Sequence, residues 1–195
     1  ATTADDDTAG YTLSDTTATV AEGPLISTAM VPVVLDTQPI SDVVFSVSSA
    51  DTGEATVSPA TLTFTSSNWS TSQYVTITGV NDDVDDGDQE TTVTISVVDG
   101  SSDDAFDGLD NQTVTVTTTD DDEAGYTLSA TTVTVTEAGT TATFTVVLDT
   151  QPSTNVVLTV TSADTGEATV SPATLTFTNG NWDSAQTVTV TGVND

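Results

Sequence analysis

The sequence predicts an all-β protein made of tandem antiparallel β-sandwiches of immunoglobulin-like type, with about seven strands each. Apolar and polar residues alternate with a period of two through most of the chain, and helical periodicity is absent. Thr supplies about a quarter of the 195 residues, and Thr and Val favour the pleated, half-buried surface of a strand. Short alternating runs separated by turn residues are typical of such sandwiches.

Seven strands are predicted in the first 120 residues. Each is a short run in which apolar side chains alternate with Thr, Ser or another polar residue. In chain order they are Gly10–Leu13 with Thr17–Ala21, Ala29–Leu35, Val43–Ser48, Ala55–Thr65, Gln73–Thr78, Thr91–Val98 and Thr113–Thr118.

Turn residues separate these runs, as in Asp36–Pro39, Asp51–Gly53 and Asn68–Trp69. The run Ala55–Thr65 is the exception, because it contains Pro59 and its alternation changes on either side of that residue. Proline cannot donate to a strand ladder, so a bend or a pair of separate strands is expected there.

A repeat of about 115 residues organises the chain. Gly10–Ser14 recurs as Gly125–Ser129, and Asp36–Asp82 recurs as Asp149–Asp195 with 34 of 47 positions identical. We therefore expect three parts: residues 1–7 as the tail of a preceding repeat, 8–122 as a complete sandwich, and 123–195 as a second sandwich without its last two strands.

Two explanations of the incomplete second copy remain open. Either the chain is a window on a longer tandem array, or a neighbouring chain supplies the missing strands by strand addition, which would build a filament. The expected partners are neighbouring repeats of the same protein and, in the second case, neighbouring chains.

The charge of the chain excludes several classes of partner. It has 30 Asp and Glu residues and no Lys, Arg or His, which gives a formal charge of −30. Phosphate contacts need Lys or Arg, so nucleic acid is excluded, and anionic lipid is disfavoured. No transmembrane run is present.

The carboxylates repel one another, so cations from solution must share them. Extracellular water holds enough divalent cation for this, which predicts an extracellular protein.

The order of the strands gathers distant acids at two ends of the predicted sandwich. In an antiparallel arrangement, the loops after the first, third, fifth and seventh strands share one end. That end collects Glu22, Asp51, Glu54, the run Asp82–Asp88 and the triplet Asp120–Asp122. The opposite end receives Asp36, Asp42 and the acidic loop Asp99–Asp110.

Calcium is the cation that this composition favours. Ca²⁺ takes about six to eight oxygen ligands in tolerant geometry, whereas Zn²⁺ prefers the His and Cys that this chain lacks. Mg²⁺ dehydrates reluctantly and seldom uses an all-protein cage. The run Asp82–Glu90 does not fit the EF-hand pattern, so any site must combine several loops.

Four parts of the second copy form a pattern that extends over nearly the whole repeat: Asp120–Tyr126, Glu137, Leu175–Phe177 and Val190–Asp195. In this pattern the sequence resembles the Calx-β fold, and more specifically the Calx-β-like modules of large bacterial surface adhesins. In the first copy the resemblance is carried by Asp82-Asp83 and Asp86-Gly-Asp-Gln89, with the run into Asp120–Asp122.

The resemblance implies a set of calcium ligands at one end of each sandwich. Gln89 stands where the family often has Glu, and the segment around Asp51 lacks the usual Asp-Tyr pattern. For the first repeat the implied ligands are Glu22, Asp51, Asp82, Asp83, Asp86, Asp120, Asp121 and Asp122. For the incomplete second repeat they are Glu137, Asp164 and Asp195.

Two interpretations of the loop Asp99–Asp110 remain open. It binds another ion, or it is a solvated loop held down by Phe106 and Leu109. The ligands in the first case would be Asp103, Asp104, Asp107 and Asp110.

We expect a non-enzymatic function: a calcium-stabilised spacer of a large surface protein, an adhesin stalk or a filament, with Ca²⁺ stiffening the junctions between modules. Two alternatives stay open. One is a regulatory calcium sensor, and the other is a carbohydrate- or surface-binding module that uses Trp69 and Trp182 or the Thr-Val runs Thr132–Thr136 and Thr187–Thr191.

Overall fold

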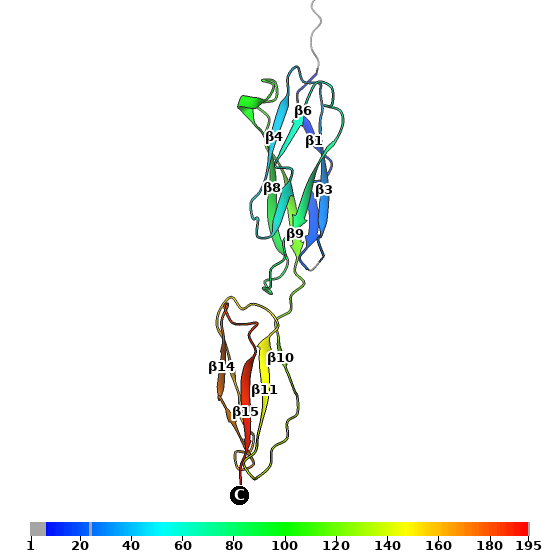
Figure 1. Ribbon diagram of the computed structural model, residues 1–195. Coiled ribbons are helices and arrows are strands. Elements are labelled where there is room, and N and C mark those ends of the chain that lie inside the picture. The colour runs from blue at the N-terminus through cyan, green and yellow to red at the C-terminus, as the bar shows by residue number, and fades with distance from the viewer. Residues whose placement is uncertain (1–6, 24, 195) are drawn as a thin grey trace, which may run out of the picture. The chain divides into compact units, whose positions relative to one another are not determined.

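A computed structural model describes residues 7–23 and 25–194, and the chain divides into two compact units (Figure 1). The first unit comprises Ala1–Asp82 with Gly87–Asp121, and the second comprises Asp83–Asp86 with Asp122–Asp195. Both are all-β: within the described residues the single helix is the short 3-10 turn η1 (Asp99–Ser101). No helix in that part of the chain is long and apolar enough to cross a membrane.

The described residues of the first unit form nine strands. Their bounds lie within two residues of the predicted runs, because the alternation of apolar and polar side chains persists to the ends of the ladders. They are β1 (Tyr11–Leu13), β2 (Thr17–Ala21), β3 (Thr28–Leu35), β4 (Val43–Ser49), β5 (Ala55–Ser58), β6 (Thr61–Phe64), β7 (Gln73–Gly79), β8 (Gln89–Val97) and β9 (Gln112–Thr119).

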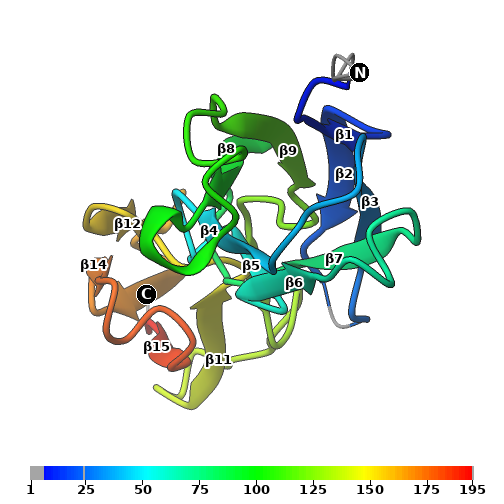
Figure 2. The same ribbon diagram turned by 90° about the horizontal axis from the view of Figure 1, so that it is seen from above.

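These strands form the two sheets of an immunoglobulin-like sandwich, which Figure 2 shows from above. One sheet has the order β1-β3-β7-β5 and the other the order β2-β9-β8-β4-β6. The predicted immunoglobulin-like sandwich of antiparallel strands is confirmed, and its one parallel pair among the described residues is β2 with β9.

Two of the predicted strands divide between the sheets. The first splits into β1, which pairs with β3, and β2, which pairs with β9. The run Ala55–Thr65 splits at Pro59 into β5, which pairs with β7, and β6, which pairs with β4. Both halves of each run continue in the same direction, so the predicted distribution of loops between the two ends is preserved.

The core of the first unit is built from the inward side chains of both sheets. Phe45 on β4 is fully buried and lies against the rings of Tyr11 (centroids 4.7 Å apart) and Phe64 (5.9 Å). The Tyr11 hydroxyl donates to the carbonyl oxygen of Ile95 (3.0 Å) and accepts from the backbone N–H of Gln112 (2.9 Å). Burial raises the pKa of this hydroxyl. The β8–β9 hairpin is therefore an integral wall of this core.

The two Trp residues belong to the cores. Trp69 is partly buried against the core of the first unit, and Trp182 packs in the same way against that of the second. Their carbonyl oxygens accept the backbone N–H groups of Leu35 and Leu148 (3.2 Å each). This packing weighs against the alternative in which the Trp rings form a carbohydrate platform.

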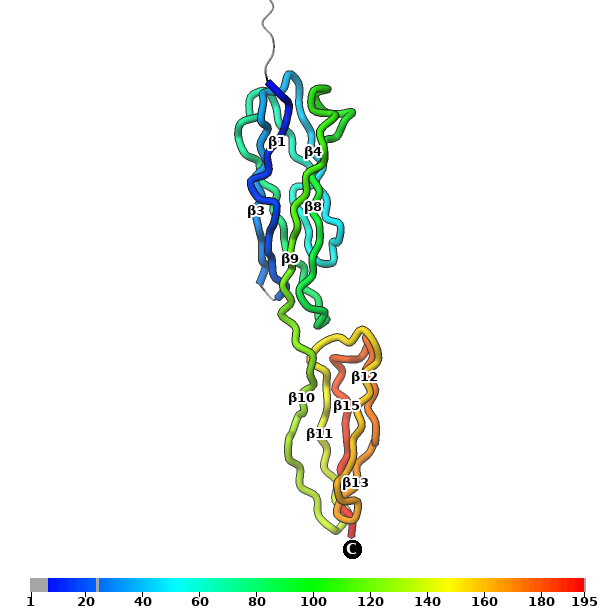
Figure 3. The backbone as a smooth tube through the Cα atoms, turned by 180° about the vertical axis from the view of Figure 1, so that it is seen from behind, coloured from blue at the N-terminus to red at the C-terminus, as the bar shows by residue number. Residues whose placement is uncertain are grey.

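The second unit, as far as the structure describes it, has six strands and a smaller core. They are β10 (Tyr126–Leu128), β11 (Thr141–Leu148), β12 (Val156–Thr159), β13 (Ala168–Ser171), β14 (Thr174–Phe177) and β15 (Gln186–Gly192). Their sheets have the orders β10-β11-β15-β13 and β12-β14. Figure 3 shows the long connection from β10 to β11, in which Thr132–Thr136 forms no strand although it corresponds to β2.

Candidate metal centre

Three carboxylates lie close together in the segments that follow β2, β7 and β9. Oxygens of Glu22, Asp82 and Asp122 all lie within 4.8 Å of one another. Glu22 directly follows β2, Asp82 lies three residues after β7, and Asp122 lies three residues after β9. We call these three residues the carboxylate cluster. No other group of three or more potential metal ligands comes this close among the residues that the structure describes.

The strand register explains why these loops meet. Ala21 at the end of β2 is opposite Thr119 at the end of β9, and Gly79 at the end of β7 lies so close to Ala21 that a Cβ there would clash with the Ala21 carbonyl oxygen. The loops that follow β2, β7 and β9 therefore leave the same end of the sandwich, as the strand order predicted.

Backbone hydrogen bonds fix the loops that carry the cluster. The N–H of Glu22 donates to the carbonyl oxygen of Thr119 (3.0 Å), and the N–H of Gly23 donates to Oδ1 of Asn81 (2.6 Å). Nδ2 of Asn81 in turn donates to the carbonyl oxygen of Asp82 (2.5 Å). Sequence reasoning gave Asn81 no role, although it stands within a segment that recurs in both copies.

The residues beside the cluster are also ordered by short contacts. Oδ2 of Asp120 accepts the N–H of Gly87 (2.7 Å), and the N–H of Asp120 donates to Oδ1 of Asp88 (3.2 Å). Gly23 has a φ of +108°, and a Cβ there would lie 2.9 Å from a carboxylate oxygen of Asp121. Asp120 and Asp121 thus line the same end as the cluster.

The chemistry of the cluster fits a hard cation. Three carboxylates so close together repel one another, and Glu22 is only 5% exposed. No Lys, Arg or His exists in the chain to offset this charge. Oxygens that share one Ca²⁺ at about 2.3–2.6 Å lie at most about 5 Å apart, which agrees with the spacing of the cluster.

Other predicted ligands of the first repeat are not part of the cluster. Oδ1 of Asp51 accepts the N–H of Gly53 (2.8 Å) and closes a local turn. Asp83 and Asp86 are exposed and belong to the second unit, where the carbonyl oxygen of Asp83 accepts the N–H of Gln151 (2.6 Å).

Within the part of the chain that the structure describes, the predicted ligands of the second copy do not come together. Glu137 is exposed, and it lines a cavity of about 570 Å³ together with Glu167. Oδ1 of Asp164 accepts the N–H of Gly166 (2.9 Å), the same turn that Asp51 makes in the first copy. Asp195 lies outside the described residues. Glu167 corresponds to Glu54, which is partly buried in the first unit and was not among the predicted ligands.

The acidic loop before β9 is held in part by a buried carboxylate. Asp103 is 6% exposed, and its Oδ2 accepts the N–H groups of Ile40 (2.6 Å) and Ser41 (3.0 Å). Its Oδ1 accepts the N–H of Ala105 (3.1 Å). These donors, that of Ser41 foremost, hold the pKa of Asp103 below its usual value.

The remaining candidates in this loop do not join Asp103 in a compact group. Phe106 is buried in the core and Leu109 packs against it, so the loop is fastened by apolar contacts. Burial raises the pKa of Asp107, and the negative charge of Asp99 raises it further. Asp104 and Asp110 are exposed.

Replacing Asp103 with Asn is expected to destabilise the first unit by about 1.5–3 kcal/mol, because three backbone donors lose a charged acceptor. The pKa of Asp103 is lowered by folding, so its contribution is present above the unfolded pKa and is lost as the pH falls through the folded pKa. Urea denaturation at pH 7 and at acidic pH measures both effects. The exposed Asp42→Asn is the matched control, and equal effects of the two substitutions would contradict the assignment.

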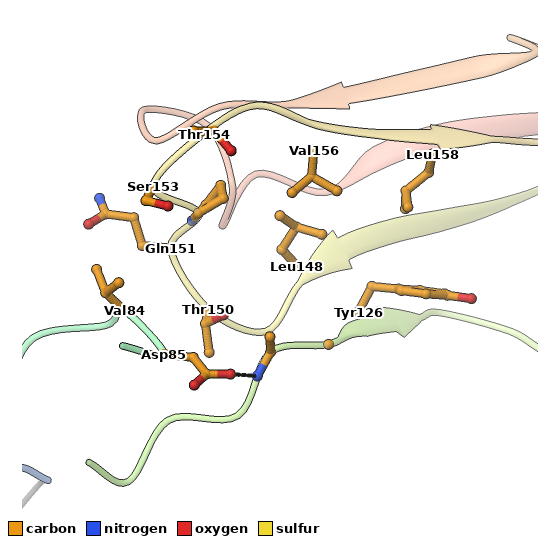
Figure 4. Close-up of a pocket in the computed structure, with 13 residues that line it drawn as sticks. Val84, Asp85, Tyr126, Leu148, Thr150, Gln151, Ser153, Thr154, Val156 and Leu158 are labelled. Carbon is orange, nitrogen blue, oxygen red and sulfur yellow. Dashed lines mark hydrogen bonds between the residues drawn. The ribbon is translucent and has the colours of Figure 1, made fainter. Parts of the chain in front are cut away.

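The second unit also has an apolar pocket of about 380 Å³ (Figure 4). The side chains of Val156 and Leu158 on β12 point toward Leu148 and Tyr126 on the facing strands. Asp85 closes one end of it, where its Oδ2 accepts the N–H of Ala124 (2.8 Å). This pocket brings together no set of catalytic or metal-binding groups.

Comparisons with known proteins concern the fold alone. No family model and no curated protein matches the chain. Among solved structures, CBD12 from CALX1.2 is similar with 15% identity and a TM-score of 0.41, over 95% of this chain and 75% of that chain. The PapD-like domain 7 of human CEP192 has 14% identity and a TM-score of 0.43, over 58% and 86%.

A Bacteroides ovatus GH5 xyloglucanase is similar with 14% identity and a TM-score of 0.39 over 56% of this chain. The match spans only 19% of the xyloglucanase. At such identities and TM-scores, these comparisons carry no argument about chemistry, partners or biological role.

Proposed function

We propose that this chain is a calcium-stabilised spacer segment of a large extracellular surface protein, such as an adhesin stalk or a filament. The observation that carries the proposal is the carboxylate cluster: three acids within 4.8 Å, one of them buried, in a chain without any basic side chain. A bound Ca²⁺ would supply the missing positive charge.

The position of the acids in the chain supports a role at the junction between modules. Six residues, Asp120–Gly125, connect β9 to β10, and the first three of them are Asp. Without a cation this link repels itself, whereas Ca²⁺ held by Asp122 together with Glu22 and Asp82 would restrain it. Near-identical tandem copies suit a spacer better than a sensor, and the resemblance to Calx-β-like adhesin modules agrees with this role.

Calcium is expected to raise the melting temperature of the first unit. At a free concentration about 100 times the Kd, binding stabilises the folded state by about 2.7 kcal/mol, which corresponds to a shift on the order of 10 °C. The fluorescence of Trp69 in a Trp182→Phe background reports on the first unit alone, since each unit contains one Trp.

The control for this experiment is ionic strength, because any salt screens 30 carboxylates. Mg²⁺ and NaCl at matched ionic strength should reproduce only a small part of the shift. Small-angle scattering with calcium and with chelator then tests the spacer role, for which a change in the distribution of particle lengths is expected. If calcium and matched salt act alike in both measurements, the proposal is wrong.

A further inference from the structure

Two side chains of the repeat are buried in the first unit, whereas their equivalents in the second unit are exposed. Tyr11 and Leu13 on β1 are 5% and 8% exposed, whereas Tyr126 and Leu128 on β10, which carry the identical sequence, are 56% and 38% exposed. The strands that carry them pair in the same register, Tyr11 with Leu35 and Tyr126 with Leu148. The difference therefore comes from what covers these residues.

In the first unit the cover is the β8–β9 hairpin. Its Val93, Ile95, Val114 and Val116 are fully buried in the core. β8 pairs with β4, and β9 pairs with β2, so the hairpin joins two strands that otherwise do not meet. The hairpin and its loop also provide the hydrogen-bond partners of the Tyr11 hydroxyl, which are the carbonyl oxygens of Ile95 and Asp110 and the N–H of Gln112.

In the second unit the corresponding place is an apolar groove of about 210 Å³. Its walls include Tyr126 and Leu128 on β10, Phe144 and Val146 on β11, Leu158 on β12 and Val160 just after β12. β12 pairs only with β14, and Thr132–Thr136 has no strand partner among the described residues. The groove thus keeps the apolar walls and the free strand edges that receive β8 and β9 in the first unit.

We propose that this groove is the docking site of a two-stranded β-hairpin of the Gln89–Thr119 type, carried on the same polypeptide. The inference does not depend on calcium, because it rests on apolar contacts and strand edges. Docking would pair β12 with the first strand of the hairpin and Thr132–Thr136, in parallel, with the second. The Tyr126 hydroxyl would gain hydrogen-bond partners equivalent to those of the Tyr11 hydroxyl.

An attached hairpin is favoured over one from another molecule. An isolated two-stranded hairpin is marginally stable in water, so a free one must be ordered on binding. A short flexible tether gives an effective concentration in the millimolar range, which offsets this cost. The β8–β9 hairpin of a second copy is already committed to the core of its own first unit.

The test is the full chain extended after Asp195 by a copy of Asp83–Asp122, the segment that follows the equivalent Asp82. Amide hydrogen exchange at Thr132–Thr136 and along β12 should slow by more than about tenfold relative to the unextended chain at the same calcium concentration. A control extension carries Val93→Asp and Val116→Asp in the appended copy, and it should give no protection.

Tyr126→Phe adds a readout that does not depend on overall folding. In the extended chain it should speed exchange at the appended equivalent of Gln112 about three- to tenfold. In the unextended chain, which lacks that amide, it should leave exchange at Thr132–Thr136 and along β12 unchanged. Equal exchange in the native and control extensions would overturn the proposal. Protection of the same amides in an unextended, concentration-dependent dimer would overturn it too, because a second copy would then cover the groove.

Discussion

Replacing Glu22 with Gln will weaken calcium binding to the chain by about 100-fold or more. The substitution keeps the shape of a side chain that is 5% exposed but removes its charge and one carboxylate oxygen. Removing even an indirect partner of a metal ligand typically lowers affinity by about 10–100-fold, so a buried direct ligand should lie at or above that range. Isothermal titration with calcium measures this loss.

The stability of the Glu22→Gln variant provides a sharper test, because its sign should depend on calcium. In chelator the variant loses the repulsion among three carboxylates within 4.8 Å, so the first unit should melt at or above the temperature of the parent chain. In calcium it loses a ligand and should melt lower. Asp15→Asn removes one exposed charge elsewhere and should show neither effect. A variant that melts lower in both conditions would indicate a purely structural role for Glu22.

The fold could be predicted from the sequence because period-two alternation is a local signal that each strand carries by itself. The ambiguity at Pro59 was also visible, and the structure resolves it into β5 and β6 in opposite sheets. The parallel pairing of β2 with β9 left no local signal. It depends on the chain changing sheets between Leu13 and Thr17, which neither half of that predicted strand shows alone.

The candidate site could be predicted only in outline. Strand order was sufficient to bring the loops of Glu22, Asp82 and Asp122 to one end, because that follows from direction alone. It could not show that Asp51 and Asp164 bond to their own turns, or that Asp103 serves the backbone of Ile40 and Ser41. Such uses of a carboxylate depend on local backbone geometry, which charge patterns do not report.

The second copy shows how strongly a strand depends on its partner. Thr132–Thr136 alternates as well as Thr17–Ala21 does, yet only the latter is a strand. Thr17–Ala21 is a strand because it pairs with β9. The β-propensity of Thr132–Thr136 thus predicts a strand, but none forms there because the second copy offers no equivalent of β9 to pair with. This is expected, since strand propensity depends mostly on structural context.

Equivalent truncations in the two copies should therefore have very unequal costs. Phe45→Ala removes a fully buried ring that packs against Tyr11 and Phe64, and it should destabilise the first unit by about 3–5 kcal/mol. Leu158 occupies the same position in the repeat but is only partly buried beside an open groove, so Leu158→Ala should cost less than about 1 kcal/mol. Urea denaturation followed through Trp69 or Trp182 alone separates the two units.

The same pair of substitutions distinguishes an open groove from a compact second unit that merely has fewer strands. In the chain extended by a copy of Asp83–Asp122, the cost of Leu158→Ala should rise to about 2–5 kcal/mol, because the docked hairpin would bury the side chain on all sides. The cost of Phe45→Ala should stay unchanged. If Leu158→Ala is already as costly in the unextended chain, then Leu158 is a core residue of a complete domain, and the groove has no hairpin to receive.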